Sequence, residues 1–362
     1  RYTNPVMQDG NRPYATAGGN MLLDPNGTPQ VQGAESMCFA LTVPRDRPMP
    51  AGGWPTVIYA HGTDGTFRSF IVPGPGPRSV ADELTDEGFA VISFDNVAHG
   101  WRQGPDPNSW SLTAATLFFN LVNPTASRDN IFQGTADLHQ LVRLVQHGGT
   151  ITKPVSLNLP LGLTVQLDPD KVLFVGHSQG TVIAPPFLVA NPNIRGAVLS
   201  GAGGELPLSI LNKRQPVDFS QVAGAFFGDR NLKRVHPMMG LLSLLFGPSD
   251  SINYAAAFAD APLPGNTALP VFHVMGVEDT FTPDVTQHAL ARAGKYPIVG
   301  PLLAPAAGVD NVATTTGTLG AAQYSAAAGS NGHFVMFDNP AAMTAVRNFL
   351  RTAASGQAVI TP

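Results

Sequence analysis

Short apolar runs alternate with segments of helical periodicity along most of this chain. The apolar runs cover residues 37–43, 56–60, 89–94, 171–175, 194–200 and 270–275. Several are apolar almost throughout, as expected for strands that are covered on both faces. Residues 79–87 and about 126–147 repeat apolar side chains every three to four positions, which indicates helices, and residues 340–352 are the last helix candidate. The alternation predicts the α/β fold class, with a mostly parallel central sheet and helices on both faces.

Two stretches interrupt this alternation. Residues 205–267 contain the apolar segment 238–246 and several aromatic residues, and we interpret them as a cap inserted between two sheet strands of a single domain spanning residues 1–362. Two interpretations stay open for the cap helices: they line an acyl or aromatic pocket, or they only pack against the body. Residues 300–325, rich in Ala, Gly, Pro and Thr, form a second insertion, and residues 1–35 are expected to be loops.

The most informative motif is Gly-His-Ser-Gln-Gly at residues 176–180. It follows the apolar run 171–175 and leads into a predicted helix, which is the strand–turn–helix context of a G-x-S-x-G nucleophile elbow. A serine at such an apex has a strained backbone, and the flanking glycines remove side chains that would collide with the neighbouring strand and helix. We therefore predict that Ser178 is a nucleophile. Pro185 and Pro186 are expected to bend the following helix or to end its first segment.

A serine hydroxyl needs a base that accepts its proton and an acidic group that orients the base. In this fold the expected chain order is serine, then Asp or Glu, then His. Asp279 follows the predicted strand 270–275 and is our candidate for the acid. His333 lies in a Gly-His-Phe loop before the last helix and is our candidate for the base.

Other residues compete for these two roles. The alternatives to Asp279 are Glu278, Asp284, Asp250 and Asp338. Among the histidines, His177 is adjacent to the serine in sequence and poorly placed as its base, and His273 lies within a strand. His61 and His99 precede glycines after earlier strands and are expected to be structural.

Acyl transfer also requires donors for the developing oxyanion. The backbone N–H of Gln179 is the first candidate, and the loop 61–65 supplies Thr63 N–H as the second, unless that loop is a plain glycine turn. The candidate substrate-binding residues are His61, Gly62, Trp101, Leu241, Leu245 and Phe246. Two roles stay open for the loop 95–102: Trp101 and Arg102 contact substrate, or the loop is structural.

Composition narrows the class of protein. Charged residues make up 13% of the chain and the net charge is −4, so no basic field indicates a nucleic-acid partner. The sequence has no Cys/His metal cluster, no G-x-G-x-x-G opening a helix and no Walker motif, so we expect neither a metal nor a nucleotide cofactor. The sequence contains no run of 18 or more apolar residues, so it predicts no transmembrane helix.

The start of the chain and its composition bear on cellular location. The chain starts at Arg1 with neither a Met nor an apolar signal region, which is compatible with processing. Low charge with abundant Gly, Pro, Ala and Thr favours an exported protein: extracellular, periplasmic or a surface lipoprotein. The single cysteine, Cys38, is expected to be a small buried residue, and it leaves the redox compartment open.

Together these motifs resemble the α/β-hydrolase superfamily of serine esterases and lipases. The resemblance is carried by residues 176–180, 61–63, 276–279 and 332–334, and it covers most of residues 37–352. It implies hydrolysis through a covalent acyl-enzyme, with Ser178, Asp279 and His333 as the triad. In addition, residues 250–254 and the Glu278-Asp279 loop are similar to bacterial extracellular lipases of the virulence-factor type.

The sequence therefore predicts a serine hydrolase that cleaves carboxylic esters with an apolar acyl or aromatic part. Its expected partners are small-molecule, lipid or polyester esters, and no long charged strip indicates a charged substrate. Two alternatives stay open: a serine peptidase or amidase that uses the same triad, and a non-catalytic binding protein on the hydrolase fold. The oligomeric state is left open.

Overall fold

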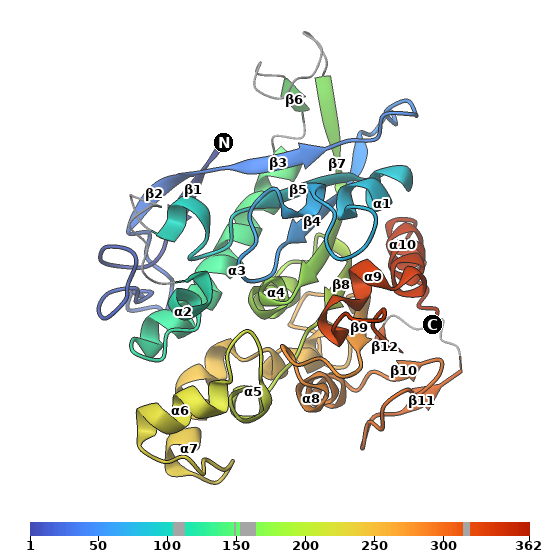
Figure 1. Ribbon diagram of the computed structural model, residues 1–362. Helices are drawn as coiled ribbons and strands as arrows, with labels where there is room; N and C mark the ends of the chain where they lie inside the picture. The colour runs from blue at the N-terminus through green and yellow to red at the C-terminus, as the bar shows by residue number, and fades with distance from the viewer. Residues whose placement is uncertain (104–112, 148–149, 153–163, 314–318) are drawn as a thin grey trace.

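The computed structural model in Figure 1 describes residues 1–103, 113–147, 150–152, 164–313 and 319–362. A ten-stranded sheet forms its centre. In spatial order the strands are β11 (Asn311–Val312), β10 (Ile298–Val299), β12 (Leu319–Tyr324), β9 (Val271–Gly276), β8 (Ile194–Ser200), β7 (Thr164–His177), β4 (Trp54–Ala60), β5 (Ala90–Phe94) and β3 (Phe39–Thr42), with β6 (Thr150–Thr152) paired to β7. Only β3 and β6 pair antiparallel in this sheet, so the predicted mostly parallel sheet is confirmed.

Helices cover both faces of the sheet (Figure 1). On one face lie α3 (Pro124–His147) and α4 (Gln179–Ala190), and on the other lie α1 (Val80–Asp86) and α10 (Pro340–Ala354). The other helices are α2 (Ala114–Phe118), α5 (Leu206–Asn212), α6 (Phe219–Phe227), α7 (Pro237–Phe246), α8 (Asp284–Gly294) and α9 (Val335–Asp338). None of the helices in these described ranges is long and apolar enough to cross a membrane.

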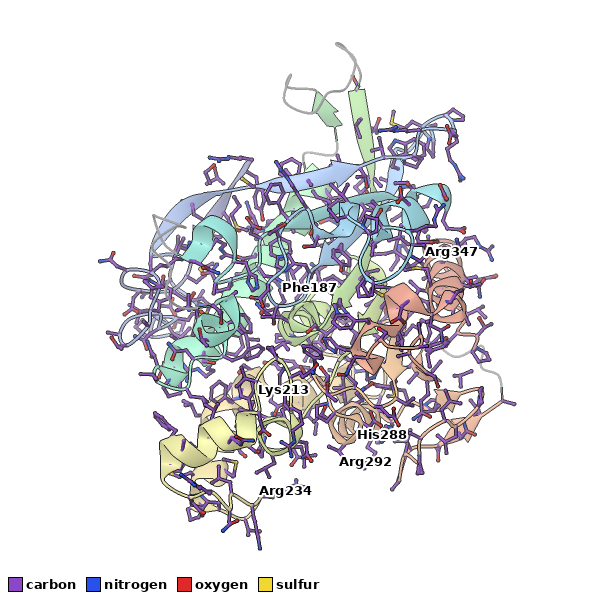
Figure 2. The ribbon with its side chains drawn as sticks, viewed as in Figure 1. Phe187, Lys213, Arg234, His288, Arg292 and Arg347 are labelled. Atoms are coloured by element: carbon purple, nitrogen blue, oxygen red, sulfur yellow. The ribbon has the colours of Figure 1, made fainter. Side chains whose placement is uncertain are left out.

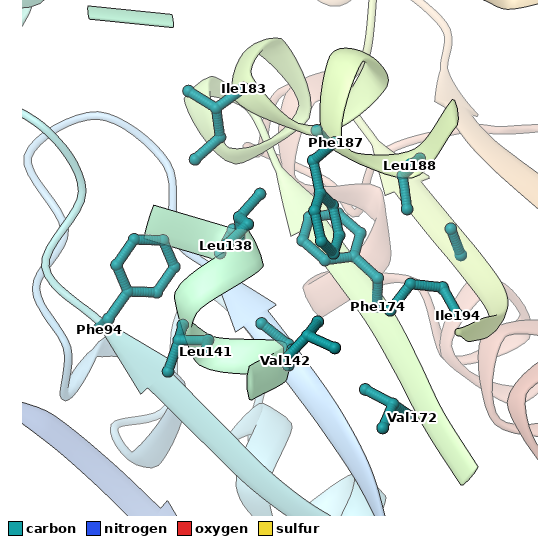
Figure 3. Close-up of a cluster of buried hydrophobic side chains, with 14 of the residues drawn as sticks. Phe94, Leu138, Leu141, Val142, Val172, Phe174, Ile183, Phe187, Leu188 and Ile194 are labelled. Atoms are coloured by element: carbon teal, nitrogen blue, oxygen red, sulfur yellow. The ribbon is translucent and has the colours of Figure 1, made fainter. Parts of the chain in front are cut away.

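The core follows the alternation of side chains along the strands. In β7, Val172 and Phe174 face α3 and α4, whereas Leu173 and Val175 belong to the cluster on the opposite face. Figure 3 shows part of the first cluster: Phe94, Leu138, Leu141, Val142, Val172, Phe174, Ile183, Phe187, Leu188 and Ile194. Because β7 has a packed layer on each side, it holds the turn that follows it in a fixed position.

The segment between β8 and β9 is largely helical. It contains α5, α6 and α7, followed by three 3₁₀ turns, η5 (Gly247–Ser249), η6 (Ser251–Asn253) and η7 (Ala255–Phe258). In Figure 1, α5, α6 and α7 lie together beyond one end of the sheet. We call this segment, residues 201–270, the inserted segment. The interpretation of residues 205–267 as a cap within a single domain stays a prediction.

The N-terminal region differs from the sequence prediction. Residues 1–35 are not all loop, because β1 (Tyr2–Val6) pairs antiparallel with β2 (Gly33–Met37). The run 37–43 was predicted as one strand, but the chain leaves β2 at Met37 and enters the main sheet as β3. Buried Asn4 donates to Asp137 on α3 at 2.7 Å, a contact 133 residues away in sequence that local patterns do not reveal.

Two further elements also differ. Helix α4 continues through Pro185 and Pro186 to Ala190, so the two prolines do not end it. Nearly all of its residues are buried, and this packing outweighs the lost backbone hydrogen bonds. Within the predicted insertion 300–325 lies β12, a mostly buried strand with Gly320, Ala321 and Ala322 at its centre and without the β-branched residues typical of strands.

Arg102 joins the N-terminal strands to the body. Its guanidinium donates to Asp137 at 2.6 Å, to Glu35 at 3.0 Å and to the carbonyl oxygen of Asp95 at 3.1 Å. Arg102 and Asp137 are 4% and 0% exposed. Of the two roles left open for Arg102, the structure supports the structural one and not substrate contact.

Replacing Arg102 with Met is expected to lower the free energy of unfolding by about 3 to 5 kcal/mol, because the Asp137 carboxylate then stays buried without its cation. Urea unfolding followed by circular dichroism measures the change. Arg78→Met is the matched control, since that guanidinium is 46% exposed in its pairs with Glu83 and Asp86. The control should change stability by less than about 1 kcal/mol. Equal effects of the two substitutions would contradict a structural role for the buried pair.

Candidate active site

Ser178 occupies the sharp turn between β7 and α4. Its backbone has φ 52° and ψ −118°, a conformation that non-glycine residues rarely adopt. The turn is held because Ser178 N–H donates to the Ser200 carbonyl at 2.9 Å, and the Thr181 hydroxyl donates to the Ser178 carbonyl at 2.6 Å. Gly180 is required here, since a Cβ at this position would lie 2.1 Å from the Ala60 carbonyl oxygen of β4. The turn thus presents a half-buried serine at the carboxyl end of a central strand.

Asp279 and His333 form a buried pair. Asp279 Oδ2 lies 2.8 Å from His333 Nδ1, and the two side chains are 0% and 2% exposed. Asp279 Oδ1 accepts the backbone N–H groups of Phe281 at 2.8 Å and Thr282 at 2.7 Å. The carboxylate is therefore fixed by three hydrogen bonds, and it orients the imidazole with Nδ1–H as the donor.

Aromatic packing and a glycine hold the His333 ring. Phe281 stacks on it with centroids 4.7 Å apart and planes at 18°, and the His177 ring lies 4.8 Å away. A Cβ at Gly201, whose φ is +61°, would lie 2.9 Å from the imidazole. The neighbouring His177 stays uncharged, because burial, with a further contribution from His333, lowers its pKa well below the usual range. His333 is therefore closely confined, and in the described residues its Nε2 has no hydrogen-bond partner.

Ser178 and His333 line the same cavity, which we call the second cavity. Gly62 also lines it, and a Cβ at Gly62 would lie 3.0 Å from Ser178 Cβ. In the described part of the chain, no hydrogen bond joins Ser178 to His333. Catalytic hydrogen bonds are often long in unliganded enzymes and tighten when substrate binds.

Thr63 and Gln179 meet beside Ser178. The Thr63 hydroxyl donates to Gln179 Oε1 at 3.0 Å, which joins the loop after β4 to the start of α4. Gln179 is the first residue of α4, so its N–H has no partner within the helix. Neither this N–H nor that of Thr63 donates to another group in the described ranges. The two predicted oxyanion donors are thus brought to one place, and both residues line the cavity next to Ser178.

His61 and His99 hold the loop that carries Thr63. His61 Nδ1 donates to the Gly62 carbonyl at 2.7 Å, and its Nε2 accepts Asn96 N–H at 3.1 Å. His99 Nε2 accepts Asp64 N–H at 3.0 Å. Burial lowers the pKa of His61 to about 3 and that of His99 to about 4, so both are neutral. His61 lines the second cavity, but both of its ring nitrogens are occupied by backbone groups. Its contact with substrate stays a prediction.

A mostly apolar cavity, which we call the first cavity, is also lined by Ser178. The space within its outline is about 1020 Å³, including the part open to solvent. Its apolar lining comes from the segment after α2, from α3 and α4, from the inserted segment and from the loop after β9: Phe119, Leu121, Ile131, Val182, Leu206, Ile210, Phe219, Phe246 and Phe281. Phe246 was predicted, and the other eight were not.

Two predicted substrate contacts lie elsewhere. Leu241 is 57% exposed on α7, and Leu245 packs within the inserted segment without lining either cavity. The reason is helical geometry, because Met239, Leu242 and Phe246 occupy the inward face of α7. The side chain of Trp101 lies outside the described residues.

In the part of the chain that the structure describes, none of the other candidates for the acid and the base hydrogen-bonds His333. Glu278 is exposed, and the Asp250 carboxylate accepts the backbone N–H groups of Glu205 and Leu206. In the described ranges, neither Asp284 nor Asp338 hydrogen-bonds a histidine. His273 lies 2.9 Å from the Tyr296 hydroxyl inside the core. Among these candidates, only Asp279 contacts His333.

One cation near Ser178 was not predicted. Lys213, directly after α5, lines both cavities together with Ser178, Thr63 and Phe281 (Figure 2). Its Nζ lies 5.5 Å from the ring centre of Phe119 and 5.6 Å from that of Phe219. The only sequence signal was the Lys213-Arg214 pair within an apolar segment, which does not say which of the two faces inward.

Comparison with solved structures identifies the fold. An acetyl xylan esterase from Paenibacillus sp. R4 is 12% identical, with a TM-score of 0.51 over 97% of this chain and 88% of that chain. Acetyl xylan esterase 1 from Thermoanaerobacterium sp. JW/SL YS485 is 17% identical, with a TM-score of 0.50 over 89% and 80%. An acylaminoacyl peptidase from Pyrococcus horikoshii is 9% identical, with a TM-score of 0.50 over 92% and 41%.

The chain therefore has the α/β-hydrolase fold, and the predicted fold class is confirmed. At such low identities the matches establish the fold alone. No protein-family model matches the sequence. A search of curated proteins also found no match. The narrower similarity to virulence-factor lipases stays a prediction.

Proposed function

We propose that this protein is a serine hydrolase that cleaves carboxylic esters through an acyl-enzyme intermediate. The observation that carries the proposal is the buried Asp279–His333 pair, which shares a cavity with the strained Ser178 of the β7–α4 turn. The shared α/β-hydrolase fold is compatible with this chemistry and does not by itself distinguish an ester from an amide substrate.

The proposed first step is acylation. Because Asp279 holds the proton on Nδ1 of His333, Nε2 is free to accept the proton of Ser178 Oγ as that oxygen attacks the ester carbonyl carbon. The N–H groups of Thr63 and Gln179 would stabilise the resulting oxyanion, and each such donor typically contributes about 3 to 4 kcal/mol. Collapse of the tetrahedral intermediate breaks the ester C–O bond, and His333 returns the proton to the leaving alcohol.

The second step is hydrolysis of the acyl-enzyme. Water attacks the acyl carbon, its proton passes to His333, and the proton returns to Ser178 as the carboxylic acid leaves. The apolar first cavity lies beside Ser178, so it is the proposed site for the acyl chain. Phe119, Ile131 and Phe246 would contact that chain.

A p-nitrophenyl ester series from acetate to palmitate, run beside a p-nitroanilide of the same acyl group, tests the proposal. Each buried methylene contributes about 0.8 kcal/mol, so kcat/KM should rise about tenfold from acetate to butyrate. Ile131→Asp, which places a charge in the cavity wall, should flatten this rise. Anilide turnover as efficient as ester turnover would favour a peptidase, and no turnover of either would contradict the proposal.

A further inference from the structure

Lys213 is the only Lys or Arg among the described residues that line the first or the second cavity. Figure 2 labels this lysine. It is half-buried and sits in the wall that the two cavities share, and the serine whose attack is proposed above also lines both of them. A group of the substrate that reached this wall from either side would meet the ammonium close to the reacting carbonyl.

The Lys213 ammonium has no anionic partner in the described ranges. No hydrogen bond or ion pair of its Nζ occurs there, and its closest contacts are the faces of Phe119 and Phe219. Neighbouring cations are paired: Arg214 with Asp218 at 3.3 Å, and Arg234 with Glu205. Burial lowers the pKa of Lys213 to about 8, although the charge of Asp279 acts in the opposite direction.

An unpaired ammonium in a mostly apolar wall is costly unless something compensates it. The carboxylates near it are already engaged, Asp279 by His333 and two N–H groups, and Asp250 by the start of α5. Contact with the two aromatic rings compensates only part of that cost. The arrangement is therefore one that an anion supplied by a ligand would complete.

We propose that Lys213 binds a carboxylate of the substrate, so that the preferred esters carry a carboxylate on the acyl or the alcohol part. This inference rests on the proposed ester hydrolysis and specifies its substrate class. A single ammonium matches one carboxylate charge, whereas a phosphate dianion is typically held by several donors. Lys213 is then a specificity-determining residue of the site.

Two matched substrate pairs distinguish the two positions of the carboxylate. The acyl arm compares mono-p-nitrophenyl glutarate with p-nitrophenyl valerate. The alcohol arm compares 4-carboxyphenyl butyrate with its methyl ester. In one arm the protein should favour the charged ester in kcat/KM by about tenfold or more, as expected for a charge-assisted hydrogen bond. Lys213→Met should remove that preference and Lys213→Arg should keep part of it, whereas the exposed Lys233→Met should retain it in full.

The preference should also depend on pH. Lys213 loses its charge as the pH rises through about 8, so the kcat/KM ratio of charged to neutral ester should fall above that pH. Taking the ratio cancels the titration of the groups that act on both substrates. The titratable and charged groups around the two cavities are Asp250, Asp279, Tyr59, His61, Asp64, His177 and His333, and the neighbouring Arg214 pairs with Asp218.

Binding to a protein without turnover separates this inference from the proposed function. In the Ser178→Ala background, calorimetry should show tighter binding of the charged ester of the favoured pair, and adding Lys213→Met should remove the difference. Equal binding of charged and neutral esters in both pairs, or a preference unaffected by Lys213→Met, would overturn the role of Lys213. A binding preference without any ester turnover by the unsubstituted protein would instead contradict the proposed hydrolysis.

Discussion

Ser178→Ala is expected to lower kcat for ester hydrolysis by about 10⁶-fold, as found when the nucleophile of a serine triad is removed. The physical reason is that no other group at the apex of the β7–α4 turn can form the acyl bond. His333 and the two N–H donors would remain, but they act on a bond that no longer forms. The fold should persist, because the hydrogen bonds that hold the turn use the backbone of Ser178 and not its hydroxyl.

Steady-state kinetics and labelling by a fluorophosphonate test this expectation together. The unsubstituted protein should take up one label and lose activity in proportion, whereas Ser178→Ala should show neither labelling nor turnover. Ser355→Ala, an exposed serine directly after α10, is the matched control and should behave as the unsubstituted protein does. Unchanged turnover in Ser178→Ala, with circular dichroism unaltered, would show that another residue carries the chemistry.

The parts of the site that the sequence predicted share one property: each follows from local chain chemistry. The strand–turn–helix context of Ser178, the acid after β9 and a histidine before the last helix are properties of short segments in a known order. The close contact of Asp279 with His333 across 54 residues follows once these segments end at the same edge of the sheet. The catalytic role assigned to them stays a proposal.

What the sequence did not predict depends on long-range packing. Asn4 in the strand Tyr2–Val6 contacts α3, and Leu319–Tyr324 forms a strand although it contains no β-branched residue. The apolar run of α7 did not reveal which leucines face inward, so Leu241 was misassigned. Lys213 shows the same limit, because only the folded chain brings its Nζ to the rings of Phe119 and Phe219 and places the residue in the lining of the cavities that contain Ser178.

Asp279→Asn is expected to lower kcat by about 10²- to 10⁴-fold while leaving the fold intact. In the unsubstituted protein the N–H groups of Phe281 and Thr282 donate to the carboxylate. The carbonyl oxygen of the introduced amide can still accept both of them. The NH₂ group of the amide would then face His333 Nδ1 and donate to it. That arrangement moves the imidazole proton to Nε2, so the ring can no longer accept the proton of Ser178.

Kinetics with a p-nitrophenyl ester measures the loss, and Glu278→Gln is the matched control because its exposed carboxylate makes no contact with His333. The tautomer change gives a second readout, since ¹⁵N chemical shifts of His333 should show the proton on Nδ1 in the unsubstituted protein and on Nε2 in Asp279→Asn. A larger kinetic loss in Glu278→Gln than in Asp279→Asn would transfer the acid's role to Glu278. An unchanged tautomer with a large loss would mean that Asp279 acts through its charge, and not by holding the ring.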